Sequence, residues 1–217
     1  MTRAVTPETT LPEPAESRTR DRARTEAAII AAARQVLAES GFQGFGVNAV
    51  ARRADCDKQL IYRYFGGLEG LVEAIGSQLA TWLEDSLAEP GEAPPATYAD
   101  LAERLILRFL DALRANPLVQ KIAAWEVADP SPLVACLTMA RGMAMVRWIA
   151  RMRGDLTPPA ALDAPALNVV LIAAVQQLVL SGASSGMFSG VDLRTDADWD
   201  RIRTAVRRLV RGAYLET

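Results

Sequence analysis

Apolar residues recur every three or four positions along most of the chain, which is the spacing of amphipathic α-helices. The first such stretch places Ile29, Val36 and Leu37 on one face. Thr25 is suited to cap the start of this helix, and Gly41 is suited to end it. The pattern therefore predicts a first helix between these two residues.

Two shorter helices are predicted after it, over residues 47–54 and 58–65. The segment between them, Asp55-Cys56-Asp57, is typical of a tight turn. The Asp57 carboxylate can accept a hydrogen bond from the free N–H groups that open the next helix. Two short helices joined in this way form a helix-turn-helix.

The second of these short helices has two unlike faces. Ile61 and Phe65 are four positions apart, so both are expected to point into the core. The other face carries the donors Lys58, Gln59, Tyr62 and Arg63. Such a face can reach phosphates or base edges in a major groove. An ordinary amphipathic helix with a solvated polar face has the same spacing, so helix spacing alone leaves both interpretations open.

The remainder of the chain is also predicted to be helical, which makes the fold class all-α. Further helices are expected over about 68–88, 97–115, 117–128, 131–153 and 197–215. Residues 164–191 contain no charged side chain and are apolar enough to suggest a membrane span. Gln176 and Gln177 at the centre of this segment argue against a span, as does the lack of basic or aromatic flanks. A helix that is apolar all round is normally buried.

Charge is unevenly distributed over the 217 residues, whose net charge is −2. Residues 17–65 carry nine Lys or Arg against five Asp or Glu, a net of +4. The short basic run at residues 18–24 contributes to this excess, and we expect it to be an arm that follows a disordered tail at residues 1–17. A locally basic segment on an otherwise acidic chain indicates that one end meets an anion.

Several kinds of chemistry lack the residues they need. The chain has no histidine, which removes the commonest general base and imidazole metal ligands. Cys56 and Cys136 match no zinc spacing and are expected to be free thiols. We therefore expect no enzyme activity, no cofactor and no metal. The N-terminal residues contain no apolar signal core, so a cytoplasmic protein is expected.

Residues 25–71 resemble the TetR-type bacterial transcriptional repressors. The resemblance is carried by Thr25 to Ala33, by Gly41-Phe42, by the V-x-x-V-A-x-x-A pattern at 47–54 and by I-Y-x-Y-F at 61–65. It implies a homodimer that binds a palindromic operator and releases it when a small molecule enters a larger C-terminal domain. The expected domains are then residues 18–67 for DNA binding and residues 68–217 for effector binding and dimerisation.

The family resemblance also implies the residues that contact DNA. Lys58, Gln59 and Arg63 are the expected base readers, since Arg favours G and Gln favours A. The hydroxyls of Tyr62 and Tyr64 are expected to bind phosphates, although half-buried packing remains an alternative for Tyr64. The other expected DNA contacts are the backbone N–H of Gly46 and the side chains of Arg52, Arg22 and Arg24.

Three positions depart from the family pattern. The family usually has Thr at Gly46, Thr or Ser at Leu60 and Lys at Leu68, and each supplies a phosphate contact. Each lost contact should lower the salt dependence of DNA binding by about one counterion. The basic run at residues 18–24, together with Arg52 and Arg53, is expected to compensate, and an arm of this kind can enter a minor groove.

In the larger domain, the expected effector contacts are Trp125, Met139, Met143, Gln120 and Glu126. Adaptable Met and aromatic side chains suit an apolar ligand, although such a stripe is also typical of a core. The family resemblance implies a four-helix dimer interface, for which we expect Leu171, Val175, Leu178, Ile202, Val206 and Leu209. The competing interpretations are an all-α enzyme or carrier with purely structural N-terminal helices, and a membrane-associated protein built around residues 166–181.

Overall fold

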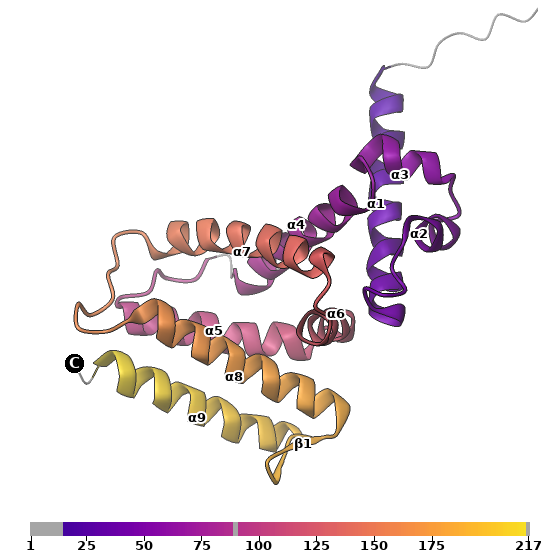
Figure 1. Ribbon diagram of the computed structural model, residues 1–217. Helices are drawn as coiled ribbons and strands as arrows, with labels where there is room; N and C mark the ends of the chain where they lie inside the picture. The colour runs from indigo at the N-terminus through magenta and orange to yellow at the C-terminus, as the bar shows by residue number, and fades with distance from the viewer. Residues whose placement is uncertain (1–14, 89–90, 216–217) are drawn as a thin grey trace, which may run out of the picture.

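The computed structural model describes residues 15–88 and 91–215, which form nine α-helices and one very short β-hairpin (Figure 1). The all-α prediction is confirmed. A small bundle is formed by α1 (Ala15–Ser40), α2 (Val47–Ala54) and α3 (Lys58–Phe65). A large bundle is formed by α5 (Tyr98–Arg114), α6 (Pro117–Ala128), α7 (Pro132–Arg153), α8 (Ala164–Ser184) and α9 (Asp196–Leu215). The helix α4 (Leu68–Leu87) runs from the small bundle into the large one (Figure 1).

The first helix begins ten residues earlier than predicted. Thr25 lies inside α1, where its hydroxyl donates to the carbonyl oxygen of Asp21 at 2.8 Å. The basic run that we expected to be an arm is therefore part of a helix. Ala and Arg are strong helix formers, and Arg22 pairs with Glu26 one turn later at 2.7 Å, so this exposed extension needs no cap at Thr25. The first fourteen residues of the expected tail lie outside the described residues.

The small bundle is held together by a compact apolar core. Its fully buried side chains include Ile29 and Leu37 of α1, Val50 of α2 and Ile61 of α3. Burying such a side chain contributes about 1.5–3 kcal/mol relative to leaving it exposed. The turn between α2 and α3 places Asp55 in the left-handed region, with φ 50°. This geometry allows α2 and α3 to meet at the angle of a helix-turn-helix.

Helix α4 packs closely against α7. Gly76 lies at the crossing, where a Cβ atom would be 2.9 Å from the carbonyl oxygen of Leu137 and 3.0 Å from the Cβ of Ala140. The absence of a side chain therefore lets the two helices approach closely. Because α4 also contacts α1, α3 and α5, it connects the small bundle mechanically to the large one.

The helices of the large bundle agree with the predicted bounds to within one residue, apart from the uncharged helix α8. Side-chain caps start most of them. Thr97 and Asp100 form a capping box on α5, and the N-terminal N–H groups of α6, α7 and α8 donate to Asn116, Ser131 and Asp163. These caps follow from local sequence, which is why the bounds were predictable.

Helices α8 and α9 contact each other near both of their ends. Tyr214 donates to Asn168 Oδ1 at 2.8 Å at one end, and the Trp199 ring approaches Gly182 at the other. The hairpin between them pairs Met187–Phe188 with Val191–Asp192, an element that the apolar pattern did not predict. Its turn needs positive φ at Ser189 and Gly190.

Helices α7 and α8 are each long and apolar enough to cross a membrane by length and composition alone. In this fold each helix buries only one side. Leu137 and Trp148 of α7 are buried, as are Leu171, Val175 and Val179 of α8, whereas apolar side chains on the opposite faces are exposed.

Candidate nucleic-acid interface and ligand cavity

The position of α3 is set by a cap, a buried anchor and a stop. The backbone N–H of Gln59 donates to the Asp57 carboxylate at 2.8 Å, which confirms the predicted cap. Ile61 has no solvent exposure and fastens the helix to the small bundle. Gly66, with φ 74°, ends the helix in the left-handed region that favours glycine. The helix is thus held rigidly with one face outward.

That outward face consists of Lys58, Gln59, Tyr62 and Arg63, which we call the donor face. All four side chains are exposed, and Tyr62 has 56% of its surface accessible, which is high for an aromatic residue on a folded domain. Within the described part of the chain, neither the Lys58 side chain nor the Tyr62 side chain has a hydrogen-bond or ion-pair partner. These two side chains are therefore available for an external acceptor.

Tyr64 links the donor face to α1. Two guanidinium groups lie over its ring, with the Cζ of Arg63 4.7 Å and the Cζ of Arg22 5.3 Å from the ring centroid. Arg63 also donates to the Tyr64 hydroxyl at 2.7 Å. The tyrosine is half-buried, so packing and orientation of two arginines account for its position in the free protein.

The other cations near this surface differ in their partners. Arg53 is bound to Glu39 and Gln35 of α1. The adjacent Arg52 is exposed and has no partner among the described residues. Arg24 lies 3.5 Å from Asp21, an exposed pair that competes weakly with any external anion.

Gly46 is the N-cap of α2 and offers no side-chain cap. Its φ of −161° and ψ of 158° are ordinary extended values, and a Cβ at this position would meet no atom within 4 Å. The position therefore tolerates a side chain, and glycine here exposes only backbone N–H groups at the start of the helix. Such groups bind anions.

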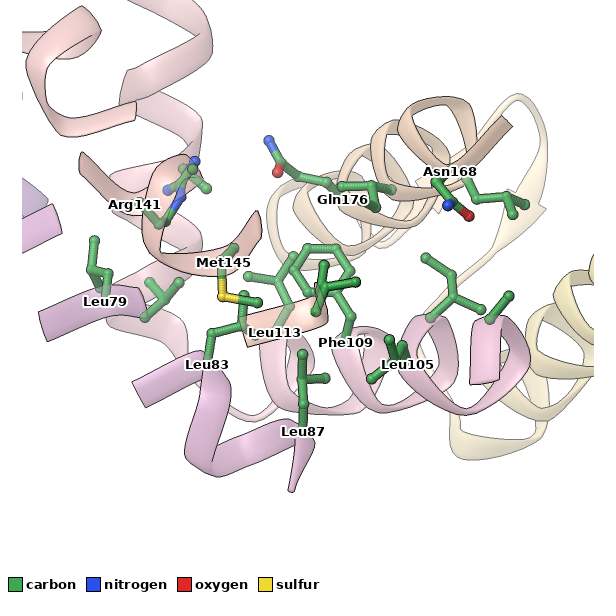
Figure 2. Close-up of a pocket in the computed structure, with 18 of the residues that line it drawn as sticks. Leu79, Leu83, Leu87, Leu105, Phe109, Leu113, Arg141, Met145, Asn168 and Gln176 are labelled. Carbon is green, nitrogen blue, oxygen red and sulfur yellow. The ribbon is translucent and has the colours of Figure 1, made fainter. Parts of the chain in front are cut away.

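An apolar cavity of about 330 Å³ lies between α4, α5, α6, α7 and α8 (Figure 2). Its lining is mostly Leu, Ile and aromatic side chains, including Leu83, Leu105, Phe109 and Met145. The volume lies in the range of small-molecule sites. The cavity can therefore hold a compact, largely apolar molecule.

A few polar side chains reach this lining. Figure 2 shows Arg141 on one side of the cavity and Asn168 on the other, with Gln176 between them in this view. Asn168 donates to the Tyr98 hydroxyl at 3.3 Å and accepts from Tyr214 at 2.8 Å. Burial raises the pKa of Tyr214 to about 12, so its hydroxyl remains a donor at neutral pH. Asn168 is thus engaged by two tyrosines.

Arg141 is paired with a nearly buried carboxylate outside the lining. Its Nη1 donates to Oε2 of Glu126 at 2.6 Å, and the Thr138 hydroxyl donates to Oε1 at 3.1 Å. The Glu126 side chain is only 6% exposed. Sequence reasoning missed Arg141 as a cavity residue, although it is the one charged residue between Ser131 and Val146, which is a usable signal.

None of the five expected effector contacts is part of the cavity lining. Met139 and Met143 lie on the exposed side of α7, because helical spacing turns them away from the face that carries Arg141 and Met145. Trp125 packs over Gly41 at the end of α1, where a Cβ would lie 2.7 Å from the indole ring.

The two polar residues expected to contact the effector are occupied within the protein. Gln120 donates to the carbonyl oxygens of Leu113 and Arg114 between α5 and α6. Glu126 reaches the cavity only through Arg141. The residues that do line the cavity come from five helices, and local sequence carries no signal of which sides face one another.

The expected dimer-interface residues fall into two groups. Leu171, Val175 and Val206 are buried inside the protomer, and Leu178 and Ile202 are half-buried. Leu209 is 63% exposed. The exposed apolar stripe of α8 lies beside the buried face of the helix. It consists of Ala166, Val169, Val170, Ala173 and Ala174.

The described residues hold no cluster of three or more metal-ligating side chains. Both cysteines are free, and burial raises the pKa of the Cys56 and Cys136 thiols, which lowers their reactivity at neutral pH.

An exposed donor helix in a helix-turn-helix, joined by α4 to a bundle with an apolar cavity, defines a DNA-binding regulator. Residues 29–75 match the model of the bacterial regulatory proteins of the tetR family. The chain is also 30% identical over 198 residues to the HTH-type transcriptional repressor SCO4008 of Streptomyces coelicolor (strain ATCC BAA-471 / A3(2) / M145), covering 88% of this chain and 97% of that protein. The chain therefore belongs to the TetR family, which confirms the resemblance, and is a transcriptional regulator.

Solved structures share the fold at low sequence identity. Salmonella enterica GusR has a TM-score of 0.63 and 20% identity, over 88% of this chain and 95% of that one. A TetR family transcription regulator from Marinobacter aquaeolei VT8 has a TM-score of 0.59 and 16% identity, over 91% of this chain and 98% of that one. The resemblance in shape thus extends over the large bundle, where the family model does not match.

Proposed function

We propose that this chain is a repressor that binds a palindromic operator as a homodimer and releases it when a small molecule fills the cavity. The observation that carries the proposal is the donor face of α3, which is exposed, lacks acidic side chains and is joined through α4 to the cavity walls. The relative named above as a repressor supports the direction of regulation.

Within the proposed DNA-binding domain, residues 18–67, Lys58, Gln59 and Arg63 read base edges in the major groove. Tyr62 binds a phosphate through its hydroxyl, and the N–H groups that follow Gly46 bind another. Arg63 has to leave the Tyr64 ring to reach a base, and an arginine held by one hydrogen bond and a cation–π contact can do so at modest cost.

The remaining cations act on the phosphate backbone. Arg52 has no competing acid, which supports a direct contact. Arg22 and Arg24 lie on the N-terminal turns of α1, and Arg22 is placed against Tyr64 beside the donor face. In this proposal Tyr64 orients Arg22 and Arg63, and its hydroxyl turns to a phosphate when Arg63 moves.

The proposed dimer interface lies in residues 68–217, on the exposed sides of α8 and α9. The stripe from Ala166 to Ala174 follows helical spacing, and Leu209 supplies an exposed apolar side chain on α9. Small and β-branched side chains allow two helices to pack closely against their symmetry mates. This use of the apolar face of α8 also favours a cytoplasmic protein over a membrane-associated one.

Effector binding is proposed to act by linkage. A ligand lowers operator affinity only as far as it prefers a state in which the two donor faces are wrongly spaced. Helix α4 lines the cavity through Leu79 and Leu83 and begins three residues after α3 ends. A shift of α4 around a ligand therefore moves α3 directly.

The proposal is tested by selecting operator sequences from random duplex DNA with the purified full-length protein. The expected product is a palindrome whose half-sites are about one helical turn apart or somewhat more. Titration at two salt concentrations then gives the number of phosphate contacts. Binding without sequence preference, or to a single half-site only, contradicts the proposal.

Dimerisation is tested with a matched pair of variants. Val170 on α8 and Val146 on α7 are both exposed, at 64% and 69%. Val170→Glu is expected to give monomers by sedimentation and to weaken operator binding, whereas Val146→Glu leaves both unchanged. Equal behaviour of the two variants contradicts the proposed interface.

A further inference from the structure

The described lining of the cavity carries charge of one sign only. Among the described residues that line it, Arg141 alone is charged, and none is acidic. The carboxylate that balances Arg141 belongs to Glu126, which lies outside the lining. An anion in the cavity therefore meets the N–H donors of a guanidinium, whereas a cation would meet no acidic side chain in the described lining.

Building on the proposed function, we propose that the effector is an amphipathic organic monoanion. Its apolar body fills the cavity, its head group pairs with Arg141, and this pairing loosens the Arg141–Glu126 ion pair that holds α6 in place.

Arg141 has unused capacity for such a head group. In the described residues it donates only through Nη1, to Glu126, although a guanidinium carries five N–H donors. A carboxylate or sulfonate entering from the cavity can accept from the remaining N–H groups, and such charge-assisted bonds are stronger than neutral ones. The side chain is 27% exposed, so it is accessible from the cavity without unfolding α7.

Apolar contacts supply the rest of the site. Leu83, Leu105, Phe109 and Met145 surround the space that extends from Arg141 toward Asn168 (Figure 2). The polar groups at the far side are already satisfied by one another, since Asn168 is held between Tyr98 and Tyr214. One charged end and one long apolar wall match a molecule with a single anionic head and an apolar tail.

The ion pair gives the ligand a route to the small bundle. In this proposal a ligand anion bound to the remaining N–H groups draws the guanidinium away from Glu126. The nearly buried carboxylate then keeps only Thr138 as a donor, which is unfavourable for a buried charge. Helix α6 then relaxes by moving Glu126 toward water. The neighbouring Trp125 packs on Gly41, where α1 ends, so a displacement of α6 is transmitted to α1.

The ligand class is tested by calorimetric titration of the full-length protein with decanoate, decanol and decyltrimethylammonium, each below its micelle concentration. The three probes share one tail and differ in head-group charge. Decanoate is expected to bind at least about tenfold more tightly than decanol, which is the gain expected for hydrogen bonds to charged groups. Decyltrimethylammonium is expected to bind most weakly. Equal affinities, or no binding of decanoate, overturn the proposal. These measurements need no DNA, so they separate this proposal from operator binding.

The role of Arg141 is tested in a variant that leaves no unpaired buried charge. The double change Arg141→Gln with Glu126→Gln is expected to remove the preference for decanoate over decanol. Arg147→Gln on the exposed side of α7 is the control and should retain the preference. A preference that survives in the double variant overturns the assignment of Arg141.

The proposed transmission from Arg141 through Glu126 and α6 to α1 is tested with Glu126→Gln alone. Fluorescence anisotropy measures its binding to the selected operator. This variant keeps Arg141 and should bind decanoate as tightly as the unaltered protein or several-fold more tightly, because the competing carboxylate is gone. Decanoate should release operator from the unaltered protein but much less from Glu126→Gln. Equal release of operator from both proteins overturns the proposed transmission through Glu126.

Discussion

The donor face of α3 and the cavity of the large bundle are opposite kinds of site. The donor face is convex, polar and built from four residues within a six-residue segment of one helix. The cavity is concave and apolar, and its walls come from five helices spread over about a hundred residues of the chain. One site depends on how a single helix is oriented, and the other depends on how several helices pack.

This difference has a consequence for function. Under the proposed function, a change at Lys58 or Tyr62 is expected to alter DNA contacts without altering the fold, because these side chains have no partner among the described residues. A change in the cavity is expected to alter packing, ligand binding and the position of α4 together. The two kinds of site are expected to respond separately to substitution, and the predictions below test how far that separation holds.

The largest effect is expected from adjacent residues on opposite faces of α3. Ile61→Ala removes a fully buried side chain and should lower the free energy of unfolding by about 2–5 kcal/mol. Tyr62→Ala should change it by less than about 0.5 kcal/mol but weaken operator binding at least about tenfold. Urea unfolding and operator titration measure both quantities. If Tyr62→Ala unfolds the small bundle, Tyr62 is a core residue and its assignment to the donor face is wrong.

The next largest effect concerns the α4–α7 crossing. Gly76→Ala places a Cβ 2.9 Å from the Leu137 carbonyl oxygen and should destabilise the protein by about 1–3 kcal/mol through overpacking. It should also change ligand affinity, because α4 forms a cavity wall. Gly142→Ala is the control for stability, since a Cβ there meets no atom within 4 Å and should stabilise helix α7 by about 0.4–1 kcal/mol. It is not a control for ligand affinity, because Gly142 also lines the cavity. Thermal unfolding distinguishes the two, and equal melting temperatures would show that the crossing is loose.

A smaller effect is expected from the two neighbouring arginines of α2. Arg52→Ala should weaken DNA binding and reduce the salt dependence by about one counterion for each protomer. Arg53→Ala should cost at most about 1 kcal/mol of stability, because it loses an exposed pair with Glu39. Operator titrations over a range of salt concentrations measure the slope. A slope that changes for Arg53 and not for Arg52 would reverse the assignment.

The smallest effect is expected at the N-cap of α2. Gly46→Thr should stabilise the protein by roughly a few tenths of a kcal/mol, because the hydroxyl caps free N–H groups at a position with suitable backbone geometry. The same hydroxyl should donate to a phosphate and strengthen DNA binding. Gly46→Ala adds the Cβ without the hydroxyl and should bring neither gain. A weaker complex with Gly46→Thr would show that the DNA backbone passes too close to this residue.

Much of the small bundle was predictable because its signals are local. The Asp57 cap, the buried Ile61 and the stop at Gly66 lie within ten residues of one another. The basic run at residues 18–24 was misjudged, because helix formers can extend a helix past a good cap when nothing stops them. The helices of the large bundle were likewise predicted from apolar spacing, whereas their side-chain caps were identified only in the structure.

The functional sites of the large bundle were harder to predict. Apolar spacing identifies a helix, but it does not say which side faces a core, a cavity or a partner. Met139 and Met145 lie on one helix and have the same chemistry, yet the first is exposed and the second lines the cavity. On α8, Val175 is buried and Val170 is exposed for the same reason.

The sequence by itself determined the helices, their caps, the helix-turn-helix, the identity of its donor face and the family. These features depend on interactions between residues close together in the chain. Only the tertiary structure decided that Arg141 faces the cavity and pairs with Glu126, and that Trp125 packs over Gly41. It also decided which side of α8 is buried and which side is exposed. Those outcomes depend on how distant helices rotate and pack against each other, and no local pattern encodes that rotation.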